Sequence, residues 1–131
     1  MLKEQQFIFP FEKLEAWHDA KRLIKDIYKM TKCFPDTEKF GLTNQINRAA
    51  VSVASNLAEG SSRTSLKDQA HFSQMAYSSL MELACQTSIA EELGFLDNEA
   101  YPSLRNSIEI LSKKINALRH SQLRRVRELK G

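Results

Sequence analysis

The chain has 131 residues, 27% charged side chains, a net charge of +3 and only four glycines and three prolines. This length suits a single domain with a substantial core, and the few breaking residues favour long elements. The mild net charge does not by itself indicate nucleic-acid binding. No apolar run approaches the roughly 20 residues that a membrane-spanning helix needs, so we expect no membrane partner.

The start of the chain and its two cysteines predict a cytoplasmic protein. The first eleven residues, MLKEQQFIFPF, hold too short an apolar stretch for a signal peptide. Cys33 and Cys85 are far apart and form no CxxC pair. We therefore interpret both as free thiols in a reducing compartment.

Apolar residues recur every three or four positions, which is the period of an α-helix. After an N-terminal arm over residues 1–10, we predict a first helix over 12–33. It ends before Pro35, because proline disfavours a helical conformation in the residue before it. We predict a second helix over 37–59, and we expect Gly60 to end it in the left-handed conformation.

The second half of the chain repeats this pattern. Ser65 to Asp68 has the spacing of a capping box, so we predict a third helix over 66–93. A fourth helix is predicted over 98–124, followed by a basic tail over 125–131. No stretch alternates with a period of two. The predicted fold is therefore all-α, an antiparallel up-down-up-down four-helix bundle with no sheet, in one domain over residues 1–131.

The second helix has almost no charge. From Phe40 to Ala58 the only charged side chain is Arg48. A helix that faces water on one side normally carries charged residues there. One explanation is that the helix is covered within its own bundle. We favour the other, a homo-oligomer whose interface includes a second small-residue face, and we expect Ala54→Glu to weaken assembly more than folding. This face consists of Val51, Ala54 and Ala58.

Four polar residues are predicted to form a partly buried network, the alternative being a set of solvated surface charges. A buried charge that loses its partner is costly, so pairing between Arg48 and Glu82 would make Arg48→Ala cost about 2–4 kcal/mol. The predicted network consists of Arg48, Asn56, Glu59 and Glu82.

Several segments of the chain resemble the 23S rRNA intervening-sequence protein family. They occur in the expected order, from about Phe11 to Leu118. The resemblance implies a four-helix bundle that assembles as a homopentamer. It extends to a similar relative, the accessory variability determinant of diversity-generating retroelements, a basic pentameric barrel that binds nucleic acid and a reverse transcriptase. The matching segments are 11–17, 34–38, 40–45, 48–52, 56–63, 79–83 and 92–96.

The search for catalytic chemistry finds one incomplete pattern. Glu15 and His18, like Asp68 and His71, form a carboxylate-x-x-His pair at one expected end of the bundle, where Glu59 also lies. Di-iron bundles use two Glu-x-x-His motifs and further glutamates. Here one motif has aspartate, and the fourth helix offers no completing acid. We therefore predict a non-enzymatic protein with no catalytic residue, metal or cofactor, and keep a di-metal enzyme as an alternative.

The C-terminal segment is the most basic part of the chain. Five basic residues stand against Glu128 in residues 119–131, a net charge of +4. Such arrays bind phosphate backbones by releasing counterions. We expect weak, sequence-tolerant and salt-dependent binding of RNA or DNA, without base stacking, because no aromatic residue lies between the arginines. The alternatives are a solubilising tail and a protein-interaction scaffold. The basic residues are Arg119, Arg124, Arg125, Arg127 and Lys130.

Overall fold

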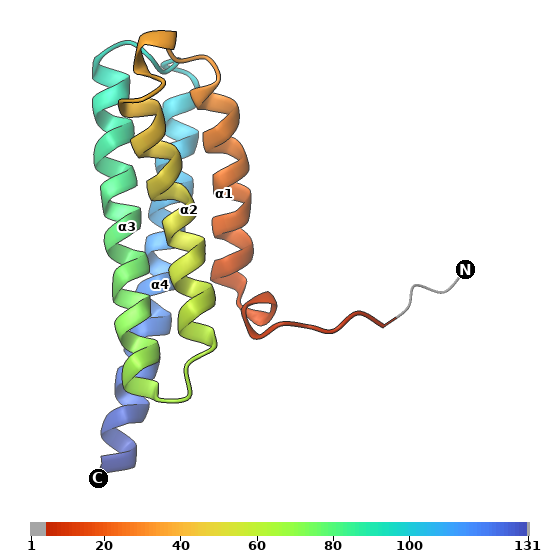
Figure 1. The fold of residues 1–131 in the computed structure, drawn as a ribbon. Coiled ribbons are helices and arrows are strands. Elements are labelled where there is room, and N and C mark those ends of the chain that lie inside the picture. Colours follow the sequence, from red (N-terminus) through yellow and green to blue (C-terminus); the bar gives the residue numbers. More distant parts are fainter. Residues whose placement is uncertain (1–4, 131) are drawn as a thin grey trace.

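A computed structural model describes residues 5–130, and over this range the chain forms four long helices. The helices alternate in direction and pack side by side, and no strand occurs among these residues (Figure 1). The all-α four-helix bundle predicted from the sequence is therefore confirmed. The helices are α1 (Glu15–Thr31), α2 (Leu42–Ser61), α3 (Leu66–Glu92) and α4 (Ala100–Lys130), with short 3-10 turns η1 (Pro10–Lys13) and η2 (Asp36–Glu38).

The core forms where the apolar stripes of the four helices meet. Each helix contributes at least one of the largest fully buried side chains. Burying one such side chain is worth roughly 1.5–3 kcal/mol, so the three-to-four spacing of the stripes is what closes the bundle. These residues are Ile27, Ile46, Val53, Leu80, Leu83, Thr87, Leu111 and Ile115.

The ends of the helices differ from the predicted bounds. The chain makes η1 before α1 and η2 before α2, so both helices begin later than expected. The capping interaction predicted for α3 is present in part, because the Asp68 backbone N–H donates to Ser65 Oγ at 3.3 Å. α4 continues to Lys130, where a basic tail was predicted from residue 125. Residues 1–4 of the predicted arm and residue 131 of the tail lie outside the described residues.

Gly60 does not end α2, and the prediction that it adopts the left-handed conformation is wrong. Among the described residues only Gly94, which follows α3, has a positive φ, of 78°. Gly60 is buried within α2, and a Cβ placed on it would lie 2.9 Å from the Cβ of Phe72 on α3. The glycine therefore allows α2 and α3 to approach closely next to the turn that joins them.

Gly60→Ala is expected to lower the free energy of unfolding by about 1–3 kcal/mol, because the new methyl group overlaps Phe72. At an open helical site the same change would stabilise the protein by about 1 kcal/mol, since alanine favours the helix. Urea denaturation followed by circular dichroism separates the two cases. An unfolding free energy equal to or above that of the unchanged protein would contradict the close contact.

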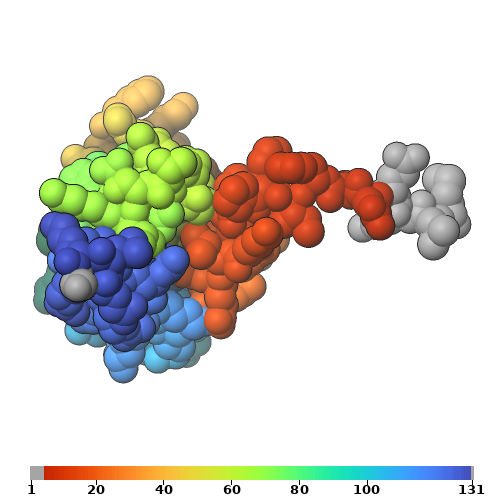
Figure 2. Space-filling view, turned by 90° about the horizontal axis from the view of Figure 1, so that it is seen from below, coloured from red at the N-terminus to blue at the C-terminus, as the bar shows by residue number. Residues whose placement is uncertain are grey.

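The first and the last described residues leave the bundle at the same end. The N-terminal arm runs outward before η1, and the last turns of α4 continue past the turn between α2 and α3 (Figures 1 and 2). At 1.5 Å per residue, the 31 residues of α4 span roughly 46 Å. In the described part of the chain, no helix is both long and apolar enough to cross a membrane.

Candidate nucleic-acid interface

The last turns of α4 hold the predicted basic residues on a continuous helix. Gln122 anchors this part to the bundle, because its Oε1 accepts a hydrogen bond of 2.7 Å from Ser73 Oγ on α3. Leu123 and Val126 are half-buried, whereas Leu129 is exposed. The helix is thus packed against its neighbours up to about residue 126, and its final turn extends into solvent.

The basic side chains of α4 are available to a partner. Arg119 is half-buried, and the other four are exposed. Over residues 5–130, none of the five has a carboxylate within ion-pair distance. We call Arg119, Arg124, Arg125, Arg127 and Lys130 the basic segment.

The turn between α2 and α3 brings further basic residues to this end, which the sequence reasoning missed. Arg63 pairs with Glu59 at 3.9 Å, and its guanidinium carbon lies 4.6 Å from the centre of the Phe72 ring. Asp68 offsets the charge of Lys67 on the first turn of α3. The turn therefore adds no net charge, and the excess positive charge of this end belongs to α4. In any up-down four-helix bundle the second turn and the C-terminus lie at the same end. This topology alone would have predicted that the basic residues of the turn lie near those of α4.

The predicted buried network of charges does not form within the chain. Arg48, Glu59 and Glu82 are all exposed, and no ion pair joins Arg48 to Glu82. Successive residues of an α-helix are about 100° apart around its axis. Arg48 follows Ile46 by two residues, so it points away from the face that buries Ile46. The prediction of a buried Arg48 is therefore wrong for the single chain.

Neutral side chains make the polar contact between α2 and α3 instead. Ser52 and Ser79 share a hydrogen bond of 2.8 Å between their Oγ atoms. The amide of Asn56, the fourth predicted network residue, donates to the Ser52 carbonyl at 2.9 Å and to its Oγ at 3.1 Å. Small hydroxyl side chains let the two helices lie close together while each polar group keeps a partner.

Arg48→Ala is now expected to change the free energy of unfolding by less than about 0.5 kcal/mol, which is usual for a surface position. Ile46→Ala, two residues away in the core, should cost about 2–5 kcal/mol in the same urea titration. A loss of 2 kcal/mol or more for Arg48→Ala would mean that Arg48 makes a contact that a single chain does not provide.

The residues predicted for a subunit interface differ in exposure. Val51 is 39% exposed, Ala58 is half-buried, and Ala54 is only 9% exposed because it packs within the core of its own bundle. We therefore expect Ala54→Glu to disturb folding as well as any assembly, so this variant does not separate the two effects. Val51 is the position that can test this face.

Charge is unevenly divided between the two sides of the bundle. α2 has two charged side chains in 20 residues and α3 has five in 27, whereas α1 has seven in 17 and α4 has ten in 31. The exposed residues of α2 and α3 also include large apolar ones, among them Val51, Met75 and Ile89. The sparse charge noticed on the second helix thus extends to the third, and we call this the α2–α3 side.

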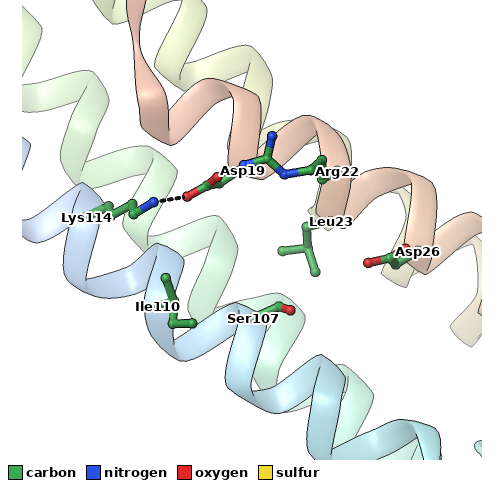
Figure 3. A pocket seen from close by; sticks show the side chains of 7 residues that line it. All are labelled: Asp19, Arg22, Leu23, Asp26, Ser107, Ile110 and Lys114. Carbon is green, nitrogen blue, oxygen red and sulfur yellow. Dashed lines mark hydrogen bonds and ion pairs between the residues drawn. The ribbon is translucent and has the colours of Figure 1, made fainter.

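The opposite side carries an ion-pair cluster that joins α1 to α4. Lys114 Nζ donates to Glu15 Oε1 at 2.7 Å and to Asp19 Oδ2 at 2.5 Å, and Asp19 also pairs with Arg22. Of these residues, Lys114, Asp19 and Arg22 line a groove of about 310 Å³ between the two helices (Figure 3). The hydrogen bonds that Lys114 donates to Asp19, and then to Glu15, raise the pKa of Lys114 above its ordinary value.

The raised pKa makes Lys114 a structural cation. Because the folded-state pKa is the higher one, the ion pair stabilises the fold fully below the unfolded pKa of about 10.4. The contribution is lost as the pH rises through the folded pKa. At neutral pH the amine therefore stays protonated and keeps its ion pairs with α1.

The two carboxylate-x-x-His pairs do not form a shared metal-ligand set. Glu15 binds Lys114, and the Nε2 atom of His18 lies 2.7 Å from the Glu12 carbonyl oxygen. His71 is exposed on α3. Across residues 5–130, no three His, Cys, Asp or Glu side chains gather closely enough to hold a metal ion. Cys33 and Cys85 are exposed and unpaired, as predicted.

Comparisons with known proteins agree with the fold. A sequence profile of the 23S rRNA-intervening sequence protein family matches residues 12–117. The crystal structure of a protein with unknown function from the S23 ribosomal protein family of Bacteroides thetaiotaomicron superposes with a TM-score of 0.73 at 17% identity, covering 79% of this chain and 96% of the other. No curated protein sequence matches significantly. Since the matched range spans most of the four helices, the chain belongs to the 23S rRNA-intervening sequence protein family.

Proposed function

We propose that this protein is a non-enzymatic, oligomeric helical module that binds RNA or DNA weakly through its basic segment. The observation that carries the proposal is the last part of α4, where four basic side chains are exposed and have no ion pair in the described chain. Counterion release from phosphate backbones needs such an array and no base-specific contact. The family match ends at residue 117, so this role is argued from the chain's own residues.

Assembly would strengthen this binding. The low charge and exposed apolar residues of the α2–α3 side favour a contact between copies, and the family resemblance supplies the proposed number, five. In a ring whose bundles stand parallel to the symmetry axis, every basic segment lies at one end of the particle. Five segments of net charge +4 would bring about 20 positive charges together, which suits a polyanion.

The choice of nucleic acid as the ligand rests partly on a family resemblance, and the proposed cellular location rests on the chemistry of the cysteines. The resemblance to the accessory variability determinant, itself a nucleic-acid binder, supports the choice of ligand and leaves room for a protein partner. A cytoplasmic location is proposed because the exposed thiols of Cys33 and Cys85 stay reduced there.

A salt titration tests the proposed function. Fluorescence anisotropy of labelled 20-nucleotide RNA and DNA strands should show binding at about 50 mM salt that weakens steeply towards about 200 mM, with little dependence on sequence. Absence of binding to either strand at the lower salt concentration would refute it. The scaffold alternative would then stand, since three consecutive apolar residues of the arm, Phe7, Ile8 and Phe9, are more than half exposed.

A further inference from the structure

A cavity of about 250 Å³ lies at the end of the bundle that carries the basic segment. The junction of η1 with α1, and the helices α2, α3 and α4, all contribute to its wall. Leu14, Leu57 and Leu118 form its apolar part, and Gln122 and Arg125 are among its polar residues. The site is thus built by residues that are up to 115 positions apart, since Pro10 also lines it.

Gln122 gives the cavity a hydrogen-bond donor that has no partner among the described residues. The residue is only 8% exposed, and its Oε1 accepts from Ser73 Oγ at 2.7 Å. This bond fixes the orientation of the amide, and the Nε2 group makes no hydrogen bond to any described residue. The Nε2 atom keeps some contact with solvent and is free to donate. A ligand that offers an oxygen or ring-nitrogen acceptor could take the place of solvent there.

Arg125 and the size of the cavity narrow the ligand further. The Arg125 guanidinium is exposed at the wall and has no ion pair in the described part of the chain, so it favours a negatively charged group. A volume of about 250 Å³ is below the roughly 300–1,000 Å³ of pockets for drug-sized ligands. A single flat group with polar edges, attached to a phosphate, offers an acceptor to Gln122 and a negative charge to Arg125, and it is small enough for the cavity.

We propose that this cavity binds one unpaired nucleobase, with Gln122 donating to an acceptor on the base and Arg125 contacting the attached phosphate. The inference rests on the proposed function and adds a base-binding site to an interface that would otherwise read only phosphates. Arg124 and Arg127, on the same part of α4, would hold the neighbouring phosphates of the strand. Recognition would then favour single strands, because a paired base is not free to enter.

The test compares two labelled strands, one of ten nucleotides with mixed bases and one of ten abasic units with the same phosphates. At fixed salt, the unchanged protein should bind the base-containing strand about tenfold more tightly, because the base gains a hydrogen bond and buries surface. Gln122→Leu should bring this strand to the affinity of the abasic one. Ser121→Phe, which fills the cavity from its half-buried rim, should do the same without touching the amide. Circular dichroism checks that both variants fold.

Arg124→Gln is the matched control, because Arg124 lies on α4 but does not line the cavity. It should weaken both strands by the same factor. Equal binding of both strands by the unchanged protein, with no NMR shift changes on adding a nucleoside monophosphate, would overturn the base site and leave the proposed function standing. Binding of neither strand would overturn both. Shift changes with the free nucleotide that Gln122→Leu abolishes, together with equal strand binding, would identify a free nucleotide as the source of the base.

Discussion

Changing Arg124, Arg125, Arg127 and Lys130 to glutamine is expected to weaken nucleic-acid binding at least about 100-fold at 100 mM salt, while the bundle stays folded. These side chains are exposed and make no ion pair within residues 5–130, so their loss removes no intramolecular contact of that kind. Each phosphate contact that is lost should reduce the slope of log affinity against log salt by roughly 0.7–0.9. Anisotropy titrations at several salt concentrations measure both quantities.

A variant with the same loss of charge at another place is the control. Four exposed lysines lie in the first half of the chain, outside the basic segment, and changing all four to glutamine also removes four positive charges. They are Lys25, Lys29, Lys32 and Lys39. If this variant weakens binding as much as the first, affinity follows total charge and the basic segment has no special role. Substitution is sharper than truncation from residue 119, because truncation would also remove the buried Gln122.

Val51→Glu is expected to convert the oligomer into a monomer of 15.0 kDa without unfolding it. Val51 is 39% exposed in the single chain, so the bundle accepts a charge there, whereas a contact with another copy would bury that charge without a partner. Burying an unpaired carboxylate costs several kcal/mol, and the cost recurs at every copy. Light scattering after size-exclusion chromatography gives the mass directly.

Tyr28→Glu is the matched control for this prediction. Tyr28 is 43% exposed and lies on α1, on the charge-rich side of the bundle. Its variant should keep the mass of the unchanged protein. An unchanged mass for Val51→Glu would exclude the α2–α3 side as the interface, and a 15.0 kDa species for the unchanged protein at micromolar concentration would exclude the oligomer.

The sequence predicts the helices well because helix formation and burial leave a periodic record. Leu104, Ile108, Leu111 and Ile115 follow one another at the spacing of a helical seam, and all four are buried. The prediction for Gly60 is wrong because a local rule for helix ends competes with a tertiary contact: what Gly60 meets is Phe72, on the next helix. Local spacing alone does not contain that neighbour.

Of the candidate site, only the basic residues can be predicted from the sequence. Basic residues cluster in sequence on α4, so their excess charge is visible in the order of the amino acids alone. The bond between Ser73 and Gln122 joins positions 49 apart, and neither residue stands out by type or spacing. Arg48 is a residue for which the sequence pattern misleads. The lack of other charges near it in the sequence suggests burial, but its position around the helix axis places it on the exposed face of α2. Burial of a polar residue depends on the angle at which a helix meets its neighbours.

The Lys114 cluster bears on the order in which the bundle folds. Lys114 lies 99 residues from Glu15 and 95 from Asp19, so this seam closes a loop that contains most of the chain. α2 and α3 are joined by a short turn and can pair at little cost in loop entropy. We expect the hairpin of α2 and α3 to form before the rate-limiting step and the seam of α1 with α4 to form after it. Lys114→Met should then speed unfolding and leave the refolding rate nearly unchanged in stopped-flow experiments, and a slower refolding rate would place the seam in the folding nucleus.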